Sequence, residues 1–448
     1  MKKLFGTDGV RGLAHELLDN GLAKNIGAAL GIILKRENGA PRVVIGGDTR
    51  ESYNDILEAL TYGLSEKGID VNIVGTVPTP AIAYFTAKCG FDAGIMISAS
   101  HNPYEYNGIK IFARGGFKLS DAAEEEIEEL IFSGIPQVES SNPGKTVYDS
   151  TLRDEYIKHL KKHAPQTKLD ILAVIDCANG SATATAKEVF SFLGDETVFL
   201  GISPDGNNIN KACGSTHIPI LAQRVVELGA DIGLAFDGDA DRFLAVDERG
   251  CEVDGDFVLA ILAESLREKG RLPGEAIVGT IMSNYGLSQF AKDRGYNFFS
   301  TKVGDRYILE EIEKCGYALG GEQSGHTIIR ESATTGDGQL TALYLLSRMA
   351  ETGKTLSSLA SLMKRFPQHT VNISATAEQK VKIKTDNRIS AIIEDIEQRL
   401  LNSGRIIVRP SGTEPVVRIM VENLDENTAA SLCLEAAKRI QEVLEESN

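Results

Sequence analysis

Short apolar runs alternate with helix-like segments along most of the chain. Residues 42–48 (RVVIGGD) and 70–75 (DVNIVG) have the length and apolar content of buried strands, and 54–68 between them has the pattern of a helix. A further helix is expected after Pro80, before the apolar run that begins at Gly94. Strands that alternate with helices predict an α/β domain, with ligands at the carboxyl ends of the strands.

The same order recurs twice more. We expect strands at 170–176, 197–201 and 231–239, with helices over 182–194 and 219–229 between them. A third round begins with the strand at 276–282 and the helix at 285–295.

The pattern changes after about Phe366. A strand at 369–376, a long amphipathic helix at 389–404, a strand pair within 405–422 and a final helix predict a small α+β domain with an antiparallel sheet. We place domain boundaries near residues 153, 253 and 367. The predicted domains are 1–153, 154–253, 254–367 and 368–448.

Composition and charge narrow the class of protein. The 448 residues are 42% hydrophobic and 25% charged, with a formal net charge of −16 and no long basic run. This argues against a nucleic-acid surface, which needs clustered Lys and Arg, although a small anionic ligand needs only a local basic pocket. No apolar window is long enough for a membrane span, so no membrane partner is expected. The six cysteines are scattered without a CxxC pair, and the first residues show no signal-peptide pattern, so we expect a cytoplasmic protein.

The motif AFDGDADR follows a predicted strand. Asp237, Asp239 and Asp241 are spaced at i, i+2 and i+4, so in a tight loop their carboxylates can converge on one hard cation. A solvated acidic turn is the plain alternative. An EF-hand is excluded because Arg242 stands where the calcium loop needs glycine and because a strand precedes the motif. The all-oxygen ligand set favours Mg²⁺.

The stretch GIMISASHNPYEYNGIKIF, residues 94–112, gathers nucleophile, acid and base candidates. A serine hydroxyl needs a base, a metal or positive charge to become a good nucleophile, and Ser98, Ser100, His101 and Lys110 supply these parts. A capped turn that serves only the local backbone is the alternative. A Ser/His/Asp hydrolase is also possible, but no GxSxG elbow surrounds either serine.

Two further loops suit a phosphorylated sugar. Each also has an interpretation without a ligand, the first as a turn between two strands and the second as an ordinary glycine-rich loop. In VRPSGTEPVVRI, a phosphate can be bound by guanidinium groups, hydroxyls and a flexible backbone, from Arg409, Ser411, Gly412, Thr413 and Arg418. In GGEQSGHTI, the residues Glu322, Ser324 and His326 alternate, so an extended segment would point them the same way, towards sugar hydroxyls or an amine. A serine, a metal site and a phosphate clamp together point to phosphoryl transfer.

These motifs, in this order, resemble the α-D-phosphohexomutase superfamily along essentially the whole chain. The residues of several motifs, and the glutamine in the sugar loop, resemble those of its bacterial phosphoglucosamine mutase branch. The motifs are FGTDGVRG at 5–12, ISASHNP at 97–103, INKACGSTH at 209–217, DGDADR at 237–242, KVGDRY at 302–307, GEQSGH at 321–326, TTGDG at 334–338 and RPSGTEP at 409–415.

The resemblance implies roles for individual residues. Ser100 matches the serine that is phosphorylated in the active enzyme, and the three aspartates match Mg²⁺ ligands, with the phosphate on Ser100 as a further contact. The matching basic residues around the phosphoserine are His101, Lys110, Arg242 and Arg11, of which the first two are the better candidates for proton transfer. The matching substrate-binding residues are Glu322, Ser324 and His326 for the sugar, and Arg409, Ser411, Gly412, Thr413 and Arg418 for the phosphate that is not reacting.

The resemblance also implies a fold and an activity. The fold is three mixed α/β domains and a smaller C-terminal domain around a central cleft, in a monomer or homodimer. The activity is the interconversion of glucosamine 6-phosphate and glucosamine 1-phosphate through a phosphoserine and a 1,6-bisphosphate, which feeds UDP-N-acetylglucosamine synthesis. A phosphoglucomutase or phosphomannomutase of the same superfamily is the nearest alternative, and a non-catalytic sugar-phosphate sensor or a phosphate-releasing hydrolase would be different classes.

One segment departs from the family's pattern. Residues 46–55 read GGDTRESYND, which keeps Asp48 and Arg50 but lacks the Ser-Gly turn usual in the family. The contacts made by this loop are therefore left undecided by the resemblance.

Overall fold

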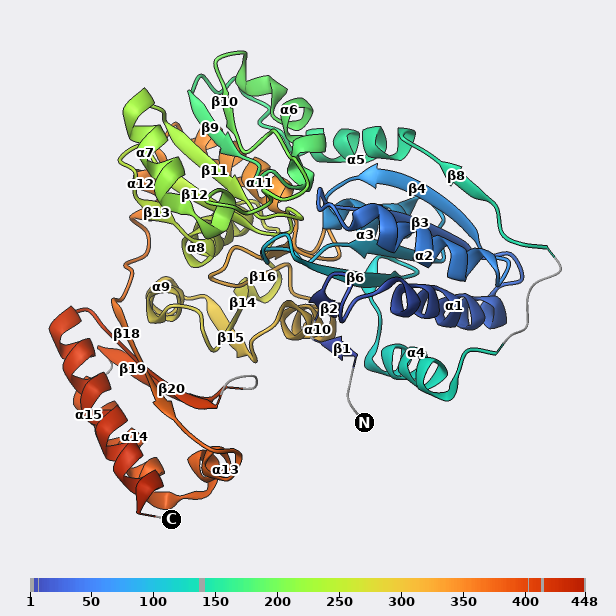
Figure 1. Cartoon of the computed structure of the whole chain (residues 1–448). Coiled ribbons are helices and arrows are strands. Elements are labelled where there is room, and N and C mark those ends of the chain that lie inside the picture. The colour runs from blue at the N-terminus through green and yellow to red at the C-terminus, as the bar shows by residue number, and fades with distance from the viewer. Residues whose placement is uncertain (1–3, 7, 137–141, 402, 412–414, 447–448) are drawn as a thin grey trace. The chain divides into compact units, whose positions relative to one another are not determined.

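The computed structural model describes residues 4–6, 8–136, 142–401, 403–411 and 415–446 (Figure 1). The chain forms two compact units. The first comprises Met1–Met282 and Tyr296–Leu362, and the second comprises Ser283–Gly295 and Met363–Asn448. Within the described ranges, no helix has both the length and the apolar character needed to cross a membrane.

The first unit begins with an eight-stranded sheet in the order β1-β2-β6-β5-β3-β4-β8, with β7 beside β6. Its central strands β3, β4 and β5 are parallel, and β6 returns antiparallel to β5. The strands are β1 (Phe5–Gly6), β2 (Gly9–Leu13), β3 (Arg42–Gly47), β4 (Asp70–Thr76), β5 (Ala93–Ile97), β6 (Tyr106–Ala113), β7 (Phe117–Lys118) and β8 (Thr146–Tyr148).

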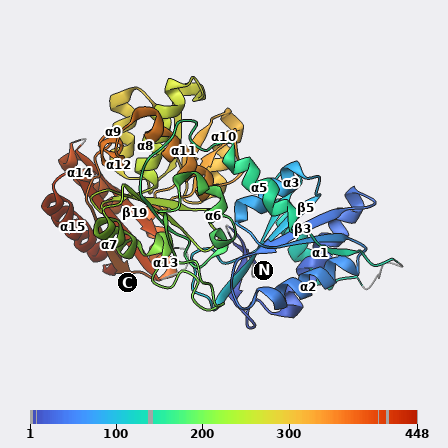
Figure 2. The same cartoon turned by 90° about the horizontal axis from the view of Figure 1, so that it is seen from above.

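Helices cover both faces of this sheet, which explains why its central strands are mostly apolar. Helices α1 (Asn20–Glu37) and α2 (Tyr53–Ser65) lie on one face, and α3 (Thr79–Lys88) and α5 (Thr151–Lys161) lie on the other (Figure 2). Every residue of β5 is buried, as expected for a strand covered on both sides. Helix α4 (Asp121–Ser133) packs beside α1.

The second sheet has the order β10-β9-β11-β12-β13 and is also mixed. It carries the acidic loop between β11 and β12, and helix α7 (Ile218–Leu228) packs on β9, β11 and β12. The strands are β9 (Ala173–Asp176), β10 (Val198–Leu200), β11 (Ile232–Phe236), β12 (Phe243–Asp247) and β13 (Glu252–Val253).

The prediction of one helix over 182–194 is wrong. The segment contains only the short helix α6 (Ala186–Val189), between 3₁₀ turns at Ser181–Ala184 and Ser191–Leu193. The hydroxyls of Thr183 and Thr185 bond the carbonyls of residues three positions earlier, a local pattern that competes with a regular helix.

The third sheet has the order β15-β14-β16-β17, with β14 parallel to β15 and β16, and β17 antiparallel to β16. The strands are β14 (Ala276–Thr280), β15 (Asn297–Thr301), β16 (Leu319–Gly321) and β17 (Thr327–Ile329). Four helices complete this part of the first unit: α8 (Gly255–Glu268), α10 (Asp305–Cys315), α11 (Gly338–Thr352) and α12 (Leu356–Ala360).

The second unit is built on a three-stranded antiparallel sheet in the order β18-β20-β19. Its strands are β18 (Gln368–Ser374), β19 (Gly404–Pro410) and β20 (Val416–Asn423), and its helices are α9 (Tyr285–Arg294), α13 (Ala377–Thr385), α14 (Asn387–Leu400) and α15 (Glu426–Glu445). The apolar faces of α14 and α15 close the core over the sheet. The predicted α/β class, with mixed sheets and an antiparallel C-terminal sheet, is confirmed.

Candidate active site

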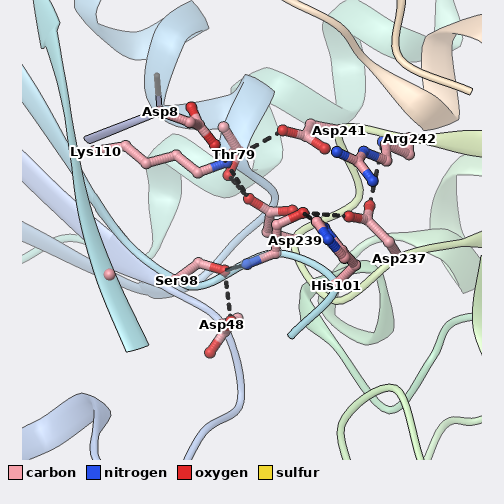
Figure 3. A network of polar contacts seen from close by, with 12 residues as sticks. Asp8, Asp48, Thr79, Ser98, His101, Lys110, Asp237, Asp239, Asp241 and Arg242 are labelled. Atoms are coloured by element: carbon pink, nitrogen blue, oxygen red, sulfur yellow. Dashed lines mark hydrogen bonds and ion pairs between the residues drawn. The ribbon is translucent and has the colours of Figure 1, made fainter. Parts of the chain in front are cut away.

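The loop after β5 holds Ser100 in an uncommon conformation. Ser100 is buried and its φ is 52°, in the left-handed region that non-glycine residues rarely adopt. Its backbone N–H donates to Ser98 Oγ at 2.9 Å, and Ser98 Oγ donates to Asp48 Oδ2 at 2.6 Å (Figure 3). Such a strained residue is kept only where its surroundings fix it, which is common at functional sites.

Arg50 holds the same loop through hydrogen bonds to its backbone. Its guanidinium is fully buried, pairs with Asp48 at 2.9 Å and donates to the carbonyls of Ser100 (3.0 Å) and Asn102 (2.8 Å). It also donates to the carbonyls of Pro103 and Tyr106. The divergent GGDTRESYND segment therefore supplies the scaffold of the serine loop.

Arg50→Met is expected to lower the free energy of unfolding by about 3–5 kcal/mol, because it leaves Asp48 buried without its cation and removes one hydrogen-bond donor from each of four carbonyls. Chemical denaturation measures this, with the half-exposed Arg224, which pairs with Glu227 on the same helix, as the matched site. Arg224→Met should change the free energy by less than about 1 kcal/mol. Equal effects at the two sites would contradict this account of Arg50.

A second donor reaches the serine loop from the part of the chain that carries the second sheet. Asn210 Nδ2 donates to the carbonyls of Ser100 at 2.8 Å and Asn102 at 3.2 Å. Gly238 lies so close that a Cβ there would stand 2.5 Å from the Ser100 carbonyl oxygen. Only glycine permits this approach, which brings the acidic loop against the serine.

The acidic loop brings its three aspartates together. Asp237, Asp239 and Asp241 follow the fully buried β11, are themselves buried, and offer carboxylate oxygens that all lie within 4.8 Å of one another. Ser100 Oγ donates to Asp237 Oδ2 at 2.6 Å. The triad predicted from the sequence and the predicted serine therefore form one cluster.

This cluster fits a divalent cation. Asp239 Oδ1 and Asp241 Oδ1 are buried and have no hydrogen-bond partner among the described residues, so two oxygens are left for a ligand of another kind. Burial, with Asp241 and Asp239 nearby, raises the pKa of Asp237 to about 8. A cation would remove this crowding of negative charge, and carboxylate oxygens suit a hard cation.

Lys110 lies on the other side of the triad. Its Nζ, which comes from β6, is 2.8 Å from Asp239 Oδ2 and 3.2 Å from Asp241 Oδ2 (Figure 3). Burial alone would lower the pKa of Lys110, but these carboxylates and Asp8 outweigh it and raise that pKa well above its usual range. In this state Lys110 is a cation at neutral pH.

His101, in contrast to Lys110, is uncharged at neutral pH. Its Nδ1 is 3.3 Å from Ser100 Oγ. Burial, together with the nearby Arg242 and Arg11, lowers the pKa of His101 to about 4, so the imidazole is neutral at pH 7 and can accept a proton. One acid and one base candidate thus lie around the serine and the triad.

Two arginines supply further positive charge. The Arg242 backbone N–H donates to Asp237 Oδ1 at 3.2 Å, and Arg11 donates to Asp8. The Nε–H groups of both arginines are buried and donate to no acceptor within the part of the chain that the structure describes. Both arginines line an open cavity of about 450 Å³ together with His101. A phosphate group is a suitable ligand for such donors.

Two residues that sequence reasoning did not select, Asp8 and Lys118, extend the network. Asp8 Oδ2 is 3.0 Å from Lys110 Nζ and accepts from Arg11, and its Oδ1 accepts from Lys118. Burial would raise the pKa of Asp8, but Lys110, Lys118 and Arg11 hold it well below its usual range. Asp8 belongs to the FGTDGVRG motif, whereas no sequence pattern singled out Lys118.

The network continues to a third missed residue, Asp305, the first residue of α10. Asp305 Oδ2 is 2.5 Å from Lys118 Nζ and 3.4 Å from His326 Nε2. His326 Nδ1 is in turn 3.8 Å from Asp241. A series of ion pairs therefore links the acidic triad to Asp305 at the start of α10. The series runs through Lys110, Asp8 and Lys118. The KVGDRY motif contains Asp305, but the motif alone gave it no role.

The sugar-loop candidates lie in a hairpin turn between β16 and β17. The segment is not extended, which was the condition for the three side chains to point the same way: Gly325 N–H donates to the Glu322 carbonyl, and the chain reverses at Gly325. Glu322 Oε1 accepts from the Gly304 N–H at 3.1 Å, and Ser324 Oγ is 3.4 Å from Glu322 Oε2. Glu322 and His326 line the same cavity as His101 and the arginines.

The phosphate-clamp candidates lie in the second unit. Arg409 on β19 and Arg418 on β20 are directly opposite each other in the antiparallel ladder, and burial and the charge of Arg418 lower the pKa of Arg409. Two guanidinium groups on neighbouring strands are suitable donors for a phosphate. Lys380 donates to the Ser411 carbonyl at 2.7 Å, while Gly412 and Thr413 lie outside the described residues.

Comparison with known domain families matches almost the whole chain. Models of the phosphoglucomutase/phosphomannomutase family match as α/β/α domain I at residues 2–137, domain II at 154–250, domain III at 254–366 and the C-terminal domain at 371–439.

Relatives and solved structures agree with these matches. The chain is 48% identical to a phosphoglucosamine mutase of Caldicellulosiruptor bescii (95% of this chain, 96% of the relative) and 47% identical to that of Thermoanaerobacter pseudethanolicus (99% and 100%). A phosphoglucomutase/phosphomannomutase family protein of Burkholderia thailandensis shares the fold, with a TM-score of 0.82 at 24% identity (99% and 98%). An Aspergillus fumigatus N-acetylphosphoglucosamine mutase, solved with GlcNAc-6P and magnesium, has a TM-score of 0.65 at 18% identity (98% and 96%).

Proposed function

Because the chain belongs to the phosphoglucomutase/phosphomannomutase family, we propose that it interconverts glucosamine 6-phosphate and glucosamine 1-phosphate. Relatives named phosphoglucosamine mutase are 45–48% identical to this chain, and the match covers nearly their whole length. The single observation that carries the chemistry is the hydrogen bond of 2.6 Å from Ser100 Oγ to Asp237 in the buried triad. It brings a candidate phosphate carrier to a candidate metal site.

We assign Mg²⁺ to Asp237, Asp239 and Asp241. Two of the triad's buried oxygens lack a hydrogen-bond partner among the described residues, and the ligands are all carboxylates. The related Aspergillus fumigatus enzyme was solved with magnesium, which supports the choice of cation. When bound, Mg²⁺ would offset negative charge on a phosphoryl group that is being transferred.

The proposed reaction moves phosphate through Ser100. With Ser100 phosphorylated, the P–Oγ bond breaks as a bond forms between phosphorus and O1 of glucosamine 6-phosphate, which gives the 1,6-bisphosphate. The 6-phosphate is then transferred to Ser100 Oγ, and glucosamine 1-phosphate leaves. Each half-reaction exchanges one P–O bond for another, and one hydroxyl proton changes place.

The surrounding residues suit these transfers. The neutral His101 ring, 3.3 Å from Ser100 Oγ, can accept the serine proton when Ser100 is the nucleophile. Lys110 is cationic and can return a proton or hold charge beside the triad. Arg11 and Arg242 offer donors to the phosphoryl oxygens, as an electrostatic clamp would.

We propose that the first three predicted domains contribute the serine, the acidic triad and the sugar loop, in that order. Glu322 and Ser324 would accept and donate hydrogen bonds with sugar hydroxyls, and His326 would support that loop. The fourth domain carries a phosphate-binding loop of its own, formed by Arg409, Ser411, Gly412, Thr413 and Arg418.

The proposed function predicts a substrate preference. With phosphorylated enzyme and Mg²⁺, kcat/KM for glucosamine 6-phosphate should exceed that for glucose 6-phosphate and mannose 6-phosphate at least tenfold, which corresponds to about 1.4 kcal/mol of transition-state discrimination. A coupled assay with the three sugars measures it. Equal or better turnover of the neutral sugars would keep the phosphoserine chemistry but assign the chain to phosphoglucomutase or phosphomannomutase activity.

A further inference from the structure

Recognition of an amino sugar raises a question that the residues implied by family resemblance leave open. Glucosamine 6-phosphate differs from glucose 6-phosphate at C2, where an ammonium replaces a hydroxyl. Both substituents can donate a hydrogen bond, but only the ammonium adds charge, so a carboxylate near C2 would distinguish them. The described part of the cavity wall presents four carboxylates, from Asp8, Asp241, Asp305 and Glu322.

Two of these carboxylates are already fully used. Asp241 Oδ2 pairs with Lys110 at 3.2 Å, and its Oδ1, which has no hydrogen-bond partner among the described residues, belongs to the triad assigned to Mg²⁺ above. Asp8 has cations on both oxygens, because Lys118 donates to Oδ1 while Arg11 and Lys110 contact Oδ2. Neither has room for the ammonium of a sugar.

The other two lie next to each other. The Gly304 N–H donates to Glu322 Oε1 at 3.1 Å, which fixes the Glu322 carboxylate at the start of α10. Asp305 is the residue that follows Gly304 and lines the same cavity. If Glu322 bonds a ring hydroxyl, as proposed above, the carboxylate of the residue after Gly304 becomes the candidate for another substituent of the same ring.

Asp305 also has the charge and the free capacity for this role. Burial would raise its pKa, but Lys118 and His326 outweigh burial and lower it, so the carboxylate is ionised at neutral pH. Its Oδ2 faces Lys118 and His326, whereas Oδ1 accepts only the Arg306 N–H among the described residues. A carboxylate oxygen can accept a second hydrogen bond.

We propose that Asp305 binds the C2 ammonium of the amino-sugar phosphate and so sets the preference for amino sugars over neutral hexoses. This inference rests on the proposed function and identifies the residue that gives it specificity. It leaves hydroxyl recognition to Glu322 and phosphoryl transfer to Ser100.

The test compares two substrates in two variants. Asp305→Asn keeps the size and the hydrogen bond to Arg306 but removes the charge, and it should reduce the ratio of kcat/KM for glucosamine 6-phosphate over glucose 6-phosphate about tenfold or more. The matched variant Glu310→Gln makes the same carboxylate-to-amide change on the same helix, at an exposed residue that is not among the described residues lining this cavity, so its ratio should stay within about threefold of wild type. Asp305→Glu should restore part of the ratio lost in Asp305→Asn.

A purely supporting role predicts a different result. If Asp305 serves only to hold Lys118 and His326, both substrates will lose the same factor in Asp305→Asn, and an unchanged ratio overturns the inference. Calorimetric Kd values for glucosamine 6-phosphate and glucose 6-phosphate give the same comparison in a variant too slow to assay. A wild-type ratio near one would remove the proposed function as well, whereas a wild-type preference that Asp305→Asn retains overturns this inference alone.

Discussion

Replacing Ser100 with alanine is expected to lower kcat by roughly four to six orders of magnitude, because the variant lacks the oxygen that carries phosphate between the two half-reactions. The fold should persist. Ser100 Oγ makes its short hydrogen bond to Asp237, whose raised pKa lets that carboxyl stay protonated and neutral when the serine is absent. Steady-state assays and phosphopeptide mass spectrometry after incubation with the 1,6-bisphosphate measure turnover and phosphate uptake.

Ser98→Ala is the matched control. Ser98 lies two residues away in the same buried loop, accepts the Ser100 N–H and donates to Asp48. Its loss should cost about 1–3 kcal/mol of stability, yet Ser100 should still take up phosphate in this variant. Substantial turnover by Ser100→Ala, or phosphate found on Ser98 in wild type, would contradict the relay through Ser100.

Local sequence patterns were sufficient to predict the parts of the site that lie within one loop. Asp237, Asp239 and Asp241 are close in sequence, and a tight turn after a buried strand is enough to bring their carboxylates together. The same local pattern put forward Ser98 and Ser100 together, since a packed set of polar residues ends an apolar strand, and only the family resemblance selected Ser100. The alternation of strands and helices likewise fixed the α/β class.

Contacts between distant segments could not be predicted in this way. Lys118 contacts Asp8, 110 residues earlier, and Asp305, 187 residues later, and no spacing rule connects them. Arg50 was noticed only as part of a divergent motif, although its guanidinium holds four carbonyls of the serine loop. These roles depend on which strand ends meet at the sheet edge, and that is a property of the tertiary fold.

Replacing Asp239 with alanine is expected to abolish metal binding and to lower kcat about a thousandfold or more, because two aspartates remain of the three and the charge on the transferring phosphoryl group is no longer offset. In wild type, Mg²⁺ at a hundred times its Kd should raise the free energy of unfolding by about 2.7 kcal/mol, and this gain should vanish in Asp239→Ala. Thermal unfolding with Mg²⁺ or a chelator measures it.

The matched control for the triad is Asp176→Asn. Asp176 is a buried aspartate at the end of the neighbouring strand β9, where it accepts the N–H groups of Ala178 and Gly214. This variant should lose stability but keep the full response to Mg²⁺. If Asp239→Ala still responds to Mg²⁺, or if wild-type turnover survives the chelator, the assignment of the metal to the triad is wrong.

The affinity of the triad for Mg²⁺ should depend on pH, and the ionisation of Asp237 determines the direction of this dependence. Burial, then the charges of Asp241 and Asp239, raise the pKa of this carboxyl to about 8 in the metal-free protein. Below pH 8 a cation must displace the proton, so the apparent affinity for Mg²⁺ should fall as the pH falls and level off above about 8. Calorimetry at pH 7 in buffers of different ionisation enthalpy should therefore show close to one proton released per Mg²⁺ bound. Binding of Mg²⁺ without proton release would mean that Asp237 is already ionised beside Ser100. Another group would then have to offset the negative charges of the three neighbouring aspartates.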